Sequence, residues 1–140
     1  MHEGPLWYRA RIRRFGPLLA LATPAVLWML DAAVRGVLDG RARGWTSLLL
    51  RLCAAPGLLA VGYPFATRTE RPLGIALSVP LWLLIGYAAA RVATRNPVAR
   101  FSDYWRAYRW LAGAVIVGVG AAYVVAAATV GLDTIRAVLP

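Results

Sequence analysis

The chain is poor in the side chains that bind metals and redox cofactors. It has one histidine, His2, one cysteine, Cys53, and two methionines, Met1 and Met29. A single cysteine excludes an internal disulfide and any CxxC-type metal site, so Cys53 is most simply a small apolar residue of a helix. Haem, iron–sulfur and structural zinc centres need more ligands than these. We therefore expect no cofactor and no metal.

The groups of nucleophilic catalysis are also scarce. Lysine is absent, and the serines have no internal histidine that could act as their base. The six carboxylates lie at or near the ends of apolar segments, so no pair of them is placed deep in a bilayer. We expect that the protein is not an enzyme. An enzymatic role would need catalytic residues from another chain.

Negative charge is scarce as well, because sixteen arginines face six acidic residues and give a formal net charge of +10. The arginines gather at the ends of apolar segments, in residues 9–14, 35–51, 68–71 and 91–109. Membrane proteins place basic side chains there to contact lipid headgroups, so we expect anionic phospholipids and not nucleic acid as partners. The use of arginine alone, with much alanine, glycine and proline, is typical of a GC-rich bacterial genome. We expect a multi-pass protein of a bacterial inner membrane.

Apolar sequence, by contrast, is abundant: 60% of the 140 residues are hydrophobic and the mean hydropathy is +0.59. The longest uncharged run, residues 110–132, has 23 residues. A helix of that length, at about 1.5 Å per residue, crosses a hydrocarbon core of about 30 Å. Three shorter apolar runs precede it. We predict an all-α integral membrane protein, a small bundle of four transmembrane helices over residues 15–37, 48–67, 72–91 and 110–132.

Proline and glycine interrupt the first two predicted spans. Pro24 predicts a kink within residues 15–37. Two prolines and two glycines lie in the second run, so residues 48–67 form either a kinked span or a re-entrant segment, and we favour the kinked span. A loop over residues 36–47 precedes it. The short turn at residues 68–71 makes the second and third spans an antiparallel hairpin.

Two polar stretches are expected to lie in the membrane interface. Residues 1–14 place aromatic rings beside four arginines, as in an interfacial anchor. The basic and then apolar order of this region is also that of a secretory signal peptide, but its one A-x-A sequence falls inside the apolar run. We therefore expect a retained first span.

The second interfacial stretch is residues 97–109, which predict an amphipathic helix leading into the last span. We expect its headgroup contacts from Trp105, Arg106, Tyr108 and Arg109. This helix is suited to an anionic lipid, but we favour the simpler interpretation, an ordinary aromatic belt. The remaining residues, 133–140, form a tail that is too short to be a domain.

One acidic side chain, Asp31, falls where the first span approaches the interface. Arg35 follows four residues later, so in a helix the two can form an ion pair on one face. A proton-coupled transporter needs a titratable group within the membrane, and Asp31 is the one candidate, with Arg35 as its partner. We favour the simpler interpretation, a salt bridge near a helix end.

The last predicted span carries a small residue at every fourth position, and these residues form a stripe along one helix face: Ala114, Gly118, Ala122 and Ala126. Helices in lipid approach closely where side chains are small, because no hydrophobic force drives them together. The stripe predicts a contact surface for another helix, either of this chain or of a partner.

Together these features predict a non-catalytic accessory subunit of a larger bacterial membrane complex, respiratory or transport-related. Its partners would be other integral membrane subunits and anionic lipid. The alternative is a small homo-oligomeric transporter or lipid-handling protein that uses Asp31 and Arg35. With four crossings, seven arginines fall on one side and nine on the other, so the charge distribution does not encode the orientation.

Overall fold

The computed structural model describes residues 5–63, 65, 67–95 and 100–130, and each regular element within these residues is a helix. The all-α prediction is confirmed for this part of the chain. The elements in chain order are α1 (Pro5–Ala20), α2 (Ala22–Val37), α3 (Gly40–Ala54), α4 (Gly57–Ala60), α5 (Arg71–Ala93) and α6 (Phe101–Val130). The expectations for His2 and for the tail at residues 133–140 lie outside the described residues.

Three helical stretches are long and apolar enough to cross a membrane. They are Trp7–Val37, which runs through α1 and α2, then Arg71–Ala93 and Phe101–Thr129. This set is compatible with a multi-pass membrane protein. The predicted count of four is not confirmed, because α3 and α4 are too short and α3 is too polar to join the set.

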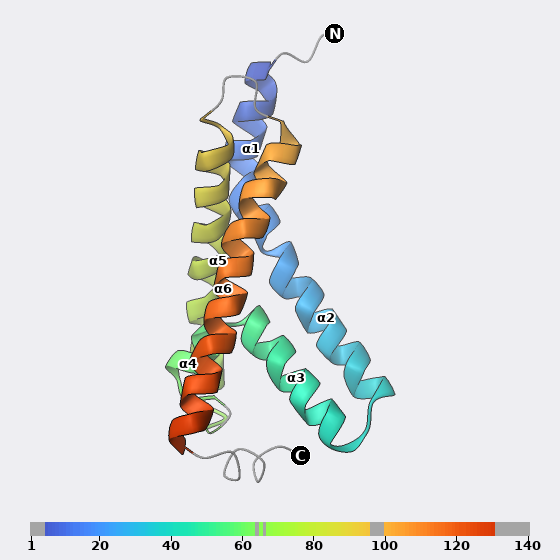
Figure 1. The fold of residues 1–140 in the computed structure, drawn as a ribbon. Coiled ribbons are helices and arrows are strands. Elements are labelled where there is room, and N and C mark those ends of the chain that lie inside the picture. Colours follow the sequence, from blue (N-terminus) through green and yellow to red (C-terminus); the bar gives the residue numbers. More distant parts are fainter. Residues whose placement is uncertain (1–4, 64, 66, 96–99, 131–140) are drawn as a thin grey trace.

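The first stretch bends between α1 and α2, at Leu21 (Figure 1). Pro24 explains the break, because proline has no N–H with which to bond the carbonyl of Ala20 one turn earlier. The Tyr108 hydroxyl of α6 lies 3.1 Å from that carbonyl oxygen and donates to it. The kink predicted from Pro24 therefore lies three residues before the proline and is held by a partner on another helix.

Residues 1–14 were expected to form an interfacial arm separate from the first span. In the described part of this region there is no such break, because α1 runs without interruption from Pro5 to Ala20. Its arginines contact the end of α5. Arg9 donates to the carbonyl oxygen of Thr94 at 3.1 Å, and Arg13 donates to the Thr94 hydroxyl, also at 3.1 Å. Cationic groups are stabilising at a helix C-terminus, so these contacts join the start of α1 to the end of α5.

The helices α1, α5 and α6 lie side by side at the end of the molecule where the chain begins (Figure 1). Glycine allows the close contact of α1 with α5: a Cβ on Gly86 would lie 2.6 Å from the Ala20 Cβ and 2.8 Å from the Gly16 carbonyl. Around this contact the core contains Ile12, Trp82, Ile85, Tyr104 and Tyr108. A second core, nearer the other end of the molecule, contains Leu48, Leu52, Leu58, Val119 and Tyr123.

The helices α2 and α3 form a hairpin that diverges from this bundle (Figure 1). The predicted loop over residues 36–47 is wrong, because α3 begins at Gly40 after only two linking residues. Gly40 has a φ of +61°, which glycine adopts without strain and which starts the new helix at a sharp angle. Two polar residues of α3, Ser47 and Arg51, contact the buried carboxylate of Asp31 on α2.

The second predicted span, residues 48–67, was expected to be kinked or re-entrant, and its helix is interrupted: α3 ends at Ala54, just before Pro56. The carbonyl left free at Ala54 accepts a hydrogen bond from the Trp82 indole N–H at 2.8 Å. The chain then turns into α4, where Gly57 donates to the Ser78 hydroxyl at 2.9 Å. A Cβ on Gly57 would lie 2.4 Å from the Gly74 carbonyl, so glycine is required at this crossing with α5.

The predicted turn at residues 68–71 is present up to Glu70, after which α5 begins at Arg71. The Thr67 backbone N–H donates to the Glu70 carboxylate at 2.8 Å. This hydrogen bond lowers the pKa of the exposed Glu70 below its usual value. The predicted interfacial helix and the last span, by contrast, form one continuous helix, α6, from Phe101 to Val130.

Candidate functional site

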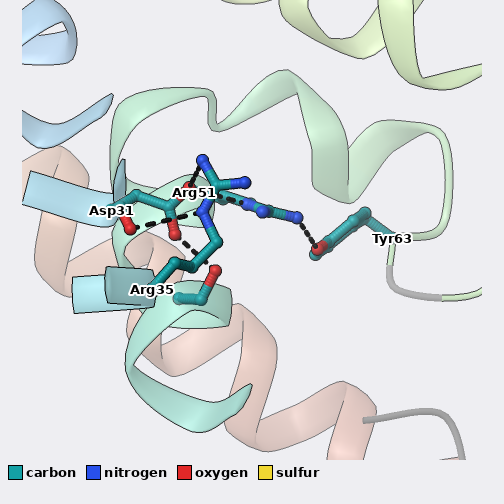
Figure 2. Close-up of polar contacts among 5 residues, drawn as sticks. Asp31, Arg35, Arg51 and Tyr63 are labelled. Atoms are coloured by element: carbon teal, nitrogen blue, oxygen red, sulfur yellow. Dashed lines mark hydrogen bonds and ion pairs between the residues drawn. The ribbon is translucent and has the colours of Figure 1, made fainter. Parts of the chain in front are cut away.

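The site is organised around Asp31 of α2, whose side chain is fully buried. Its carboxylate has one partner on the next turn of α2 and two partners on α3 (Figure 2). The Ser47 hydroxyl donates to Oδ1, while Oδ2 lies 3.0 Å from Arg51 Nε and 3.1 Å from Arg35 Nη2. Both carboxylate oxygens therefore have partners. The i,i+4 spacing places Arg35 beside Asp31, and α3 supplies the other two groups.

Arg51 continues the network beyond the carboxylate. Its Nη1 lies 3.4 Å from the Tyr63 hydroxyl, on the segment between α4 and α5 (Figure 2). The guanidinium of Arg71 lies over the Tyr63 ring, 5.7 Å from its centroid. One chain of contacts thus links α2, α3 and the start of α5.

Three residues of the site were not predicted from the sequence: Arg43, Ser47 and Arg51. They recur at every fourth residue, which places them on one face of a helix. That signal is present in the sequence, but residues 36–47 were assigned to a loop, where the spacing has no meaning. The wrong secondary structure concealed the polar face of α3.

A pocket of about 230 Å³ lies against this polar face. It is lined by Arg35, Arg43, Gly44, Ser47, Leu48, Arg51 and Tyr63. Asp31 is not among the lining residues, because it lies behind the two arginines that it holds. Among the described residues, Arg43 makes no hydrogen bond and no ion pair, and its side chain is half-buried.

The charges of the site do not balance. Three guanidinium groups line the pocket and one carboxylate lies behind it, which leaves two excess positive charges. A buried carboxylate is stable only with partners, so Asp31 fixes the positions of Arg35 and Arg51. The arrangement can bind an anion.

The stripe of small residues lies on an exposed face of α6. All four of its members are exposed in this chain: Ala114, Gly118, Ala122 and Ala126. A Cβ built on Gly118 meets no atom within 4 Å. No helix of this chain that the structure describes therefore covers the stripe.

The four residues expected to contact headgroups do not share one environment. Trp105, Arg106 and Arg109 are exposed. Tyr108 is buried, because its hydroxyl bonds the Ala20 carbonyl and its ring stacks on Tyr104 with centroids 5.9 Å apart. An aromatic residue next to arginines looks interfacial in sequence, and the sequence does not reveal the carbonyl that Pro24 leaves free.

Among the described residues no three histidine, cysteine or acidic side chains are grouped as metal ligands. Cys53 is a free, half-buried thiol on α3. Ser78, one of the serines considered for catalysis, donates to the Gly74 carbonyl and accepts from Gly57, so it supports the crossing of α4 and α5. Comparisons of the chain with protein-family models, with curated proteins and with solved structures find no match.

Proposed function

We propose that the chain is a multi-pass protein of a bacterial inner membrane with three crossings, in which α3 and α4 form a re-entrant segment. This topology rests on where the segment meets α5. Ala54 bonds Trp82, the twelfth of the 23 residues of α5, and Gly57 then bonds Ser78, one turn back toward the start of that helix. Eleven residues of helix span about 16 Å, half of a hydrocarbon core of about 30 Å. The segment thus reaches about half depth and returns to the side from which it came.

Re-entrant backbone is tolerated in a membrane where protein covers it and satisfies its polar groups. Both conditions are met at the turn between α3 and α4. The Ala54 carbonyl has Trp82 as its donor, and the Gly57 N–H has the Ser78 hydroxyl as its acceptor. The residues between them, Ala55 and Pro56, carry no side-chain polar group. This turn is therefore suited to membrane depth.

Within this topology we propose that the protein acts as a non-catalytic accessory subunit of a larger membrane complex. The observation that supports this role is the uncovered stripe on α6. The face is apolar, its small residues expose backbone for close approach, and the described chain supplies no helix to occupy it. Its occupant is a transmembrane helix of another subunit. Trp105, Arg106 and Arg109, at the other end of α6, contact lipid headgroups.

The docking role is tested by Gly118→Leu, which fills the stripe with a bulky side chain. Because no atom of the described residues lies within 4 Å of the new Cβ, we expect the monomer to accommodate leucine. Gly120→Leu is the matched control: it makes the same change at nearly the same depth and also meets nothing within 4 Å, but it lies about 160° around the helix from Gly118. Native electrophoresis should show that Gly118→Leu releases the subunit and Gly120→Leu does not. Equal assembly of the two variants would refute the docking surface.

The second candidate is a small homo-oligomeric transporter or lipid-handling protein that uses Asp31 and Arg35. The observation in its favour is that Arg35 lines the pocket. Against it, Asp31 does not line the pocket, and both of its carboxylate oxygens have partners within the fold. This candidate predicts that Asp31→Asn abolishes transport and leaves folding intact. The accessory subunit reading predicts that the same substitution acts on stability.

A further inference from the structure

We propose that the pocket between α2 and α3 is a binding site for a phosphate group. Its three arginines would bind the phosphate, and Ser47 and Tyr63 complete the polar lining. The site lies away from the α6 stripe and does not depend on the docking role. Its ligand is either the phosphate of a lipid headgroup or a soluble phosphate.

The unbalanced positive charge of the pocket favours an anionic ligand. Arg35 and Arg51 share the one carboxylate of the site, and Arg43 has no partner among the described residues. In a partly desolvated pocket such like charges repel each other more strongly than they would in water. A bound phosphate offsets this excess: a lipid phosphodiester carries one negative charge, and a phosphate monoester near neutral pH carries about 1.5 to 2. The pocket is therefore suited to an anionic group and not to a neutral or cationic one.

The free N–H groups of the three guanidiniums are suited to phosphate oxygens. A guanidinium carries five N–H groups in a planar fork that matches two oxygens of a phosphate. Arg51 uses its Nε toward Asp31 and its Nη1 toward Tyr63, and Arg35 uses its Nε and one Nη toward Asp31. Unused N–H groups remain on both, and the whole fork of Arg43 is unused among the described residues. Asp31 thus positions two donors in advance, which lowers the entropic penalty of binding.

The volume of the pocket suits a small ligand. The pocket holds about 230 Å³, which is less than the roughly 300–1,000 Å³ of clefts that enclose drug-sized molecules. A phosphate with a short substituent fits this volume. Arg43 lies one turn inside the start of α3, close to the end where α2 and α3 are linked, so the pocket lies toward a membrane surface in the proposed topology. Headgroup phosphates occupy that region.

The test is Arg43→Gln, which removes one donor fork and one charge without taking a partner from any described residue. Arg41→Gln is the matched control, since it removes the same charge two residues earlier on α3 from an exposed position outside the pocket. In uncharged detergent, calorimetry measures the binding of inorganic phosphate. Native mass spectrometry measures retention of phosphatidylglycerol by the same samples.

We expect the wild type to bind in at least one arm, Arg43→Gln to bind about tenfold more weakly there, and Arg41→Gln to differ from wild type by less than about twofold. Binding of the lipid alone would identify a headgroup; binding of inorganic phosphate alone would identify a soluble ligand, and binding of both would identify the phosphate group itself. No binding in either arm, or equal binding by the two variants, would overturn the proposal. Gly118→Leu should leave this binding unchanged, which separates it from the docking role.

Discussion

At the scale of single residues, Asp31 joins α2 to α3 through one buried carboxylate. It is fully buried, and its two oxygens join Ser47 and Arg51 of α3 to Arg35 of its own helix. Removing one member of a buried ion pair leaves the other without its counter-charge, which is the usual reason for a large loss of stability. The two arginines are partly exposed, so water compensates for part of that loss.

We expect Asp31→Asn to lower the free energy of unfolding by about 2 kcal/mol, less than the roughly 3–5 kcal/mol lost when a buried pair is broken, because the arginines reach solvent. Asparagine keeps the shape and one acceptor, but it removes the charge that holds Arg35 and Arg51. The measurement is thermal unfolding in detergent. Asp39→Asn, at an exposed carboxylate that makes no described contact, should change stability by less than about 0.5 kcal/mol.

If Asp31→Asn folds as stably as the wild type and instead loses a transport activity, the salt-bridge interpretation fails and the transporter candidate replaces it. Ser47→Ala gives an intermediate case, because it removes one neutral donor and leaves both ion pairs in place. Its loss should be about 1.5 kcal/mol, because the serine hydroxyl donates to a charged carboxylate.

At the scale of elements, the long apolar helices were predictable and the polar one was not. Residues 72–91 and 110–132 were identified from uncharged length alone. The first range falls within α5, and the second lies within α6 as far as the structure describes it, to Val130. The helix α3 was missed because glycines and arginines read as a loop in isolation. It is stabilised by Asp31 on another element, and no local pattern contains that contact. The same holds for Tyr108, whose partner carbonyl lies 88 residues away.

The proposed re-entrant topology predicts on which side of the membrane the two ends of the segment α3–α4 emerge. With three crossings, the link before α3 and the turn before α5 emerge on the same side of the membrane; with four, they emerge on opposite sides. Asp39 and Thr69 are exposed residues at these two places. A Cys53→Ala background removes the one native cysteine.

We expect single cysteines at Asp39→Cys and Thr69→Cys to react with a membrane-impermeant maleimide from the same side of sealed vesicles. Right-side-out and inverted vesicles give reciprocal labelling, so each variant supplies its own control. Labelling of the two positions from opposite faces would restore the kinked span and a fourth crossing. The pocket would then lie at a different depth from the one argued above.

At the scale of the whole molecule, the described helices are joined to one another, but one face of α6 has no neighbouring helix. Tyrosine hydroxyls, close glycine contacts and the Asp31 network join the helices. The uncovered face of α6 contains the stripe of small residues. The sequence predicted the stripe from spacing alone, but only the fold distinguishes a stripe used within the chain from one that is left uncovered.

The most direct test of the central claim is native mass spectrometry of the protein extracted from its own membrane in a mild detergent. The account predicts that the chain is found with different membrane subunits in a fixed ratio, and that this ratio is lost in Gly118→Leu and kept in Gly120→Leu. A lone monomer, or an oligomer of this chain alone, would contradict the accessory subunit and leave the Asp31 and Arg35 transporter as the account to be tested next.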